Sequence, residues 1–78
     1  MTALLRHAAE EASEFIQAAM KLAREDWGTK QLTDEAADTT AFVLLLIERG
    51  VIDVKRFDKR TAKKLKKMRA KYSDDKSK

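Results

Sequence analysis

Apolar residues recur at helical intervals along most of this chain. At about 100° per residue they gather on one side of the first and third of three stretches, whereas the second contains a run that is apolar on every face. Gly28 and Gly50 separate these stretches, and a glycine just past the last periodic residue is a common helix stop. The pattern predicts three helices, over residues 2–27, 33–49 and 54–72.

The residues between the stretches support the same division. Thr33 and Asp53 have side chains suited to cap the starts of the second and third helices. We therefore predict an all-α fold with a single domain over residues 1–72. The remaining residues, 73–78, are polar and are expected to form a disordered tail.

The second helix contains an apolar run, Ala41–Ile47, that covers almost two turns. A helix that is apolar on every face must be covered on every side. Two partner helices of this size do not cover it, whereas a second copy of the chain does. We expect a homodimer or homotetramer in which the second helix is central to a four-helix-bundle type of core. The alternative is a monomer that leaves an apolar patch exposed.

Composition narrows the possible classes of protein. The 78 residues contain no Cys and a single histidine, His7, which excludes disulfides and a Cys/His zinc site. The run Ala41–Ile47 is the longest apolar segment, and a bilayer crossing needs about 20 apolar residues. We expect a cytoplasmic protein without a signal peptide or a membrane partner.

Charge is divided sharply along the chain. Residues 1–54 carry 5 Lys and Arg against 10 Asp and Glu, whereas residues 55–78 carry 12 against 3. The overall net charge of +4 therefore describes neither part.

Two carboxylates lie at the start of the apolar side of the second helix. Glu35 and Asp38 are three residues apart, which places them on one face, and Phe42 follows on that face. Burying ionised carboxylates without a partner is costly, and two together repel each other. One explanation is the helix dipole, which favours acids in a first helical turn. That explanation does not account for the apolar neighbours.

The first helix offers a matching pair, Glu11 and Glu14. A single pair at this spacing is common on exposed helices, but two pairs on packed helices can converge. An all-oxygen site suits Mg²⁺, with Mn²⁺ also possible. We therefore predict a metal site formed by Glu11, Glu14, Glu35 and Asp38.

These residues also match a family pattern. Glu10-Glu11-Ala-Ser-Glu14 followed by Glu35-Ala-Ala-Asp38 resembles the EExxE…ExxD signature of the all-α nucleoside triphosphate pyrophosphohydrolases, in particular the short MazG-like proteins of bacteria and phages. The resemblance implies Mg²⁺-dependent hydrolysis of a nucleoside triphosphate, or a related nucleotide, to a monophosphate and pyrophosphate. It implies that the four carboxylates bind the metal and that Glu10 orients or deprotonates the attacking water.

The chain is also similar to the phosphoribosyl-ATP pyrophosphohydrolases of histidine biosynthesis. That group has a longer segment before its first motif and a Tyr-His pair after the Asp. Here Thr39-Thr40-Ala41-Phe42 stands in that place, so this sibling group is the second choice.

Basic residues are candidates for binding the substrate phosphates. The first helix supplies Lys21, and the third supplies Arg60, Lys63, Lys64 and Lys67. For each single residue, a solvated face that aids solubility is the alternative. Trp27 is expected to pack in the core or an interface, and His7 to be an ordinary exposed histidine.

A second function also fits the sequence. A helical dimer could bind nucleic acid through the phosphates, using the basic third helix, with no enzymatic activity. No known base-reading motif accompanies the basic residues, which makes a nucleic-acid partner the less favoured prediction. A small structural or adaptor protein is a third interpretation.

Overall fold

The computed structural model describes residues 1–25 and 28–73, and these residues form three helices and no strand. The helices are α1 (Thr2–Glu25), α2 (Thr29–Glu48) and α3 (Val54–Lys71). The predicted all-α, three-helix chain is thereby confirmed. Trp27 and the predicted tail from residue 74 onward lie outside the described residues.

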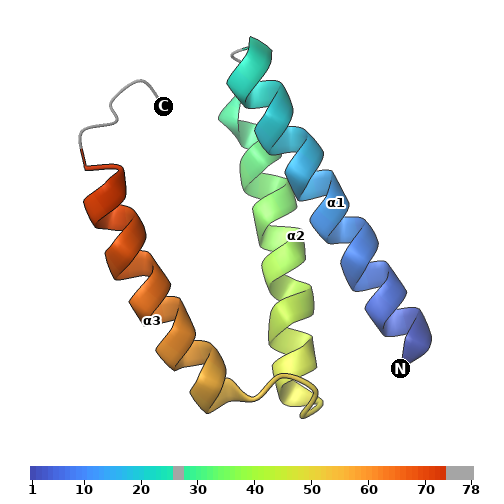
Figure 1. Cartoon of the computed structure of the whole chain (residues 1–78). Helices are drawn as coiled ribbons and strands as arrows, with labels where there is room; N and C mark the ends of the chain where they lie inside the picture. The colour runs from blue at the N-terminus through green and yellow to red at the C-terminus, as the bar shows by residue number, and fades with distance from the viewer. Residues whose placement is uncertain (26–27, 74–78) are drawn as a thin grey trace.

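The α1 and α2 helices pack side by side as an antiparallel hairpin (Figure 1). Ala18 of α1 is 3% exposed and Leu46 of α2 is 8% exposed, and they are the buried apolar residues of the described chain. The hydroxyl of Thr39 on α2 donates a hydrogen bond of 3.1 Å to the carbonyl oxygen of Glu11 on α1. Apolar contact and one cross-helix hydrogen bond therefore set how the two helices are aligned.

The start of α2 differs from the prediction. The helix begins at Thr29 with Gly28 as N-cap at φ −59°, so Thr33 lies inside the helix and is not its cap. The Thr33 hydroxyl instead donates to the carbonyl oxygen of Thr29 at 2.8 Å. Once a helix is nucleated, each further residue adds a hydrogen bond at little cost. No glycine or proline interrupts residues 29–33, so the helix extends back to Gly28.

The connection from α2 to α3 is held by hydrogen bonds at both ends. Gly50 adopts φ +76°, and its N–H donates to the carbonyl oxygen of Ile47 at 3.0 Å. The N–H of Val51 donates to the carbonyl oxygen of Leu46 at 3.0 Å, which completes a Schellman motif. Gly50 is thus the helix stop that the sequence predicts.

The next helix begins as its sequence predicts. The Asp53 carboxylate accepts hydrogen bonds from the backbone N–H groups of Lys55 and Arg56, at 3.0 and 3.3 Å. This is the expected N-cap of α3. Local hydrogen bonds therefore define both the end of α2 and the start of α3.

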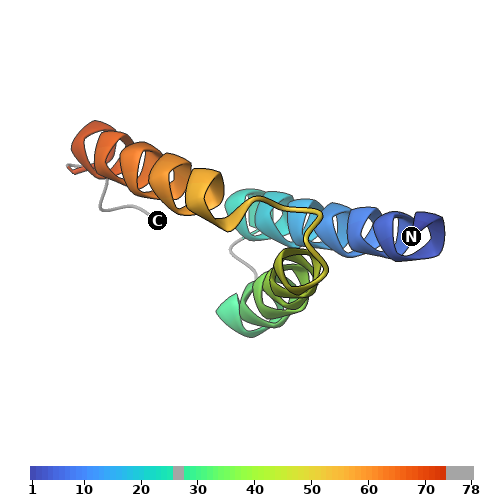
Figure 2. The ribbon, with the colours of Figure 1, turned by 90° about the horizontal axis from the view of Figure 1, so that it is seen from below.

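The α3 helix stands apart from the hairpin (Figures 1 and 2). None of its residues is buried. The Cα radius of gyration is 14.5 Å, whereas a compact domain of this length has about 11.5 Å. The accessible surface is 6728 Å², roughly 1,900 Å² more than the value of about 4,800 Å² typical of a folded monomer of this mass. A single chain therefore does not enclose a core.

The uncovered surface includes large apolar side chains on all three helices. The Leu44 side chain, in the apolar run of α2, is 54% exposed, and Ile16 on α1 is 60% exposed. One copy of the chain by itself therefore leaves these apolar side chains exposed. Among the described residues, no helix has the length and apolar content to cross a membrane.

The positive φ of Gly50 generates a test of the α2–α3 connection. A Gly50→Ala variant should be less stable by about 1–2 kcal/mol, because a Cβ is disfavoured in the left-handed region. Thermal unfolding followed by circular dichroism measures the change. The control is Gly28→Ala, where φ is −59° and an added Cβ meets no atom within 4 Å, so that only the N-cap preference for Gly over Ala is lost. Equal melting temperatures for the two variants would contradict this account of Gly50.

Candidate metal centre

Three carboxylates from two helices meet beside the α1–α2 contact. Glu11 and Glu14 lie on α1, and Glu35 lies on α2. Each offers a carboxylate oxygen within 4.8 Å of the others. The i, i+3 spacing places the two α1 residues on one face, and the antiparallel packing brings α2 alongside. The predicted convergence of acids from both helices is therefore present for these three residues.

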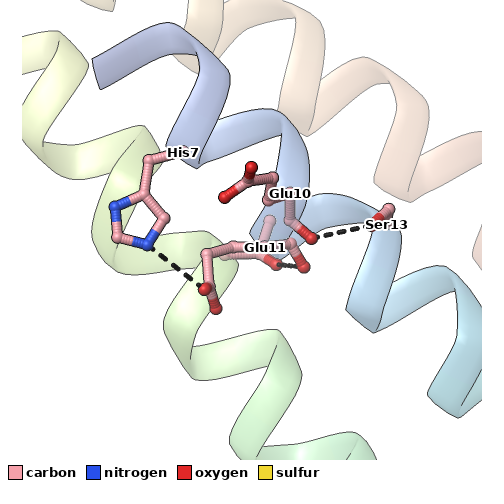
Figure 3. Close-up of polar contacts among 5 residues, drawn as sticks. His7, Glu10, Glu11 and Ser13 are labelled. Atoms are coloured by element: carbon pink, nitrogen blue, oxygen red, sulfur yellow. Dashed lines mark hydrogen bonds and ion pairs between the residues drawn. The ribbon is translucent and has the colours of Figure 1, made fainter. Parts of the chain in front are cut away.

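Glu11 is held in place by its neighbours. Its side chain is 18% exposed, and its Oε2 lies 3.5 Å from Nε2 of His7, one turn earlier on α1 (Figure 3). The His7 ring packs against the Phe42 ring of α2, with centroids 4.6 Å apart. His7 is more than half exposed, as expected, but it links an acid of the cluster to the apolar run of α2. Its spacing of four residues before Glu11 is the sequence signal for that contact.

Of the three acids, Glu35 has the least favourable surroundings for a charged carboxylate. Its Oε1 is buried, and no hydrogen bond reaches it from the described residues. Loss of hydration raises the pKa of Glu35 above its ordinary 4.5, and the negative charges of Glu14, Asp38 and Glu11 raise the pKa further. A hydrogen bond between the protonated carboxyl and Glu14 acts in the same direction. The folded chain thus holds Glu35 where its charged form is disfavoured.

The helix dipole does not explain this arrangement. Because α2 begins at Thr29, its first turn contains no acidic residue, and Glu35 and Asp38 lie beyond it. The stabilising effect of a helix N-terminus falls off within the first turn. The negative charges of Glu35 and Asp38 therefore repel each other, and the dipole of α2 does not offset this repulsion.

The remaining predicted acids lie at the edge of the cluster. Asp38 is exposed and is not one of the three residues whose oxygens meet, although its charge raises the pKa of Glu35. Glu10 is also exposed, and its backbone carbonyl accepts a hydrogen bond of 2.8 Å from the Ser13 hydroxyl (Figure 3). Both side chains are available to solvent or to a ligand.

The predicted phosphate-binding residues fall into two places. Lys21 is partly buried on α1. The other four line a hollow of 180 Å³ on the surface of α3, and they are Arg60, Lys63, Lys64 and Lys67. Since α3 stands apart from α1, which carries two of the three meeting carboxylates, one chain does not bring this group to the acidic cluster (Figures 1 and 2).

The chemistry of the donors defines which ligand fits. Glu11, Glu14 and Glu35 present only oxygens, and hard divalent cations prefer such ligands. Mg²⁺ retains several water molecules and is completed by phosphate oxygens in many nucleotide sites. A divalent cation here would reverse the electrostatic cost of bringing three acids together.

No family model, curated protein or solved structure matches this chain. Any assignment of function therefore depends on the residues and geometry described above.

The raised pKa of Glu35 predicts how stability depends on pH. Below pH 4.5 the carboxyl is protonated in both states and has no linkage effect. As pH rises from 4.5 through the higher pKa of the folded state, the unfolded chain loses its proton more readily, so folding stability decreases. In metal-free protein, Glu35→Gln should therefore raise the melting temperature at pH 7 and have a smaller effect at pH 4. Thermal unfolding at both pH values measures the difference.

The control is Glu48→Gln, since Glu48 is exposed at the end of α2 and is not among the acids that meet. It should change the melting temperature equally little at both pH values. Stabilisation by Glu35→Gln that is the same at pH 4 and pH 7 would contradict the assigned cause.

Proposed function

We propose that this chain binds Mg²⁺ at Glu11, Glu14 and Glu35, and that it hydrolyses a nucleoside triphosphate or related nucleotide to a monophosphate and pyrophosphate. The observation that carries the proposal is the convergence of three carboxylates on a buried oxygen of Glu35 that has no hydrogen-bond partner in the described chain. A site of this kind is costly in the absence of a cation.

The metal chemistry follows from the donor set. A hard cation held by carboxylates neutralises charge on the phosphate chain and lowers the pKa of bound water. Glu11, Glu14 and Glu35 would hold it, and we propose that the exposed Asp38 completes the set when the ligand is bound. The resemblance to MazG-like proteins in the EExxE…ExxD pattern supports the choice of a nucleotide substrate.

Glu10 is the proposed base. Its exposed carboxylate neighbours Glu11 in sequence and is not committed to the three-acid cluster. In the proposed reaction, water attacks the α-phosphorus, the bond from that phosphorus to the bridging oxygen breaks, and pyrophosphate leaves. Glu10 accepts the proton of the attacking water. Lys21 and the basic residues of α3 bind the phosphates of the substrate before this step.

We propose that the active form is a homodimer or homotetramer. The exposed apolar side chains and the roughly 1,900 Å² of excess surface support this. A single chain also does not bring the α3 residues near the acids, so a substrate pocket with both charges requires another copy. The assembly that best fits the apolar faces is a four-helix-bundle type of core with α2 at its centre.

The direct test is pyrophosphate release from a panel of nucleoside triphosphates with Mg²⁺ or Mn²⁺. Activity should require the metal and should fall by on the order of 100-fold or more in Glu35→Gln, because a ligand contributes at least as much as the groups that orient it. Glu14→Gln and Asp38→Asn should also reduce the activity. Glu48→Gln is the matched control and should retain it. Metal-independent release, or full activity in Glu35→Gln, would reject the proposed site.

A second candidate function is nucleic-acid binding by α3. This helix carries 10 Lys and Arg against one Asp, and none of its residues is buried. Such a helix can bind phosphates through charge alone. The observation favours binding but supplies no feature that reads bases.

The two functions respond differently to the same variants. If α3 binds duplex DNA, the affinity should decrease steeply with salt, and Lys63→Ala with Lys67→Ala should reduce the slope of log affinity against log salt by about 2. Glu35→Gln should leave this binding unchanged. Fluorescence anisotropy at several salt concentrations measures the slope, and a salt-independent affinity would exclude this function.

A further inference from the structure

An apolar stripe runs the length of α3, and all of its residues except the partly buried Phe57 are exposed. Residues at intervals of three and four form it: Val54, Phe57, Thr61, Leu65, Met68 and Tyr72. Leu65 is 44% exposed and Tyr72 is 48% exposed. With 18 residues the helix is about 27 Å long, so the stripe is long enough to cover a whole helix of a neighbouring protein.

In the described chain this stripe does not fold back onto its own hairpin. The Schellman motif at Gly50 ends α2 and the Asp53 cap begins α3. In this orientation α3 diverges from α2 along most of its length (Figure 1).

The outward face of α2 is a matching surface. Leu44 lies about 160° around the helix from the buried Leu46, so it points away from α1. Leu44 is 54% exposed, and Ala37 and Ala41 on the same face are also exposed. These small and apolar side chains leave room for an approaching helix.

Charges beside the two surfaces are complementary. Asp34 and Asp38 are exposed and lie within about 60° of Ala41 around α2, and Asp34 also pairs with Lys30 at 3.2 Å. Along α3, one flank of the apolar stripe carries Arg60, Lys64 and Lys67. A pairing of α3 with α3 would instead bring two helices of net charge +9 together, since each has 10 Lys and Arg and one Asp.

The amount of uncovered surface also fits a second copy. Each subunit of an obligate dimer buries about 1,000 Å² to about 2,500 Å². The excess of roughly 1,900 Å² per chain lies within that range. Residues 1–53 carry 5 Lys and Arg against 10 Asp and Glu, so the acidic surface that α3 needs is present in every copy of the chain.

We infer that two copies exchange their third helices, so that α3 of each packs its apolar stripe on the outward face of α2 of the other. This places Arg60, Lys64 and Lys67 beside the partner's Asp34 and the partner's Asp38. The basic residues then stand at the edge of the partner's acidic cluster. The inference specifies the contacts of the proposed assembly, and hydrolysis is assayed separately from it.

Cysteine crosslinking distinguishes exchange from folding back, because the chain has no native Cys. Full-length Leu44→Cys and Leu65→Cys chains, carrying different tags, are co-expressed and treated with a short bismaleimide. Thr61→Cys and Met68→Cys in place of Leu65→Cys allow for a shift of one helical turn. The control is Lys66→Cys, which lies about 140° around α3 from the centre of the stripe. Light scattering gives the mass of each sample, and circular dichroism verifies that each variant is helical.

Exchange predicts a dimeric mass and a covalent heterodimer from the co-expressed chains. Its yield should be several-fold higher with a cysteine in the stripe than with Lys66→Cys. A double variant whose crosslink stays within one chain, with no heterodimer from the single variants, would show that α3 folds back and would overturn the inference. A monomeric mass, or equal yields at Leu65→Cys and Lys66→Cys, would overturn it as well. Loss of nucleotide hydrolysis with the heterodimer intact would reject only the enzymatic proposal.

Discussion

The contact between α1 and α2 is the interaction on which the rest of this structure depends. Ala18 and Leu46 are the apolar residues that it buries, and Thr39 aligns the two backbones by bonding to the Glu11 carbonyl oxygen. The small side chain of Ala18 lets the helices approach closely. That approach brings Glu35 to the two acids of α1, so apolar packing is what holds the like charges together.

The unfavourable free energy of bringing these like charges together is concentrated at Glu35. One of its oxygens is buried without a hydrogen-bond partner in the described chain, and desolvation together with three neighbouring charges raises its pKa. Two changes relieve such a cost, namely binding of a proton at low pH or of a cation at neutral pH. The proposed Mg²⁺ site is the second of these, and it turns an unfavourable feature of the isolated chain into a binding site.

The third helix has the opposite electrostatic character and no packing of its own. The Gly50 turn and the Asp53 cap are local features that end α2 and begin α3, and the apolar stripe of α3 is exposed at every residue except the partly buried Phe57. A short connection that carries an amphipathic helix away from its own hairpin is well suited to association between copies. The division of charge within one sequence gives such an association a preferred partner surface.

Much of the fold follows from the sequence alone, and the reason is that helices are local. The periodic apolar residues predict three helices, and Gly50 and Asp53 mark the boundary between the second and third correctly, because left-handed glycine and N-cap carboxylates act on their immediate neighbours. The same reasoning places the start of α2 too late, at Thr33 instead of Thr29. A capping hydroxyl and a hydroxyl bonded back along the helix have the same sequence signature.

The candidate metal site also has one part that the sequence predicts and another that depends on the tertiary structure. The spacing of Glu11 and Glu14, and of Glu35 and Asp38, is a property of single helices and is visible in the sequence. Only the tertiary structure decided that Glu35 joins the two acids of α1 while Asp38 stays at the edge, since this depends on how far α1 and α2 slide and rotate against each other. Only the tertiary structure likewise showed α3 standing apart, because its direction results from the conformation of the short turn and not from the pattern of apolar residues.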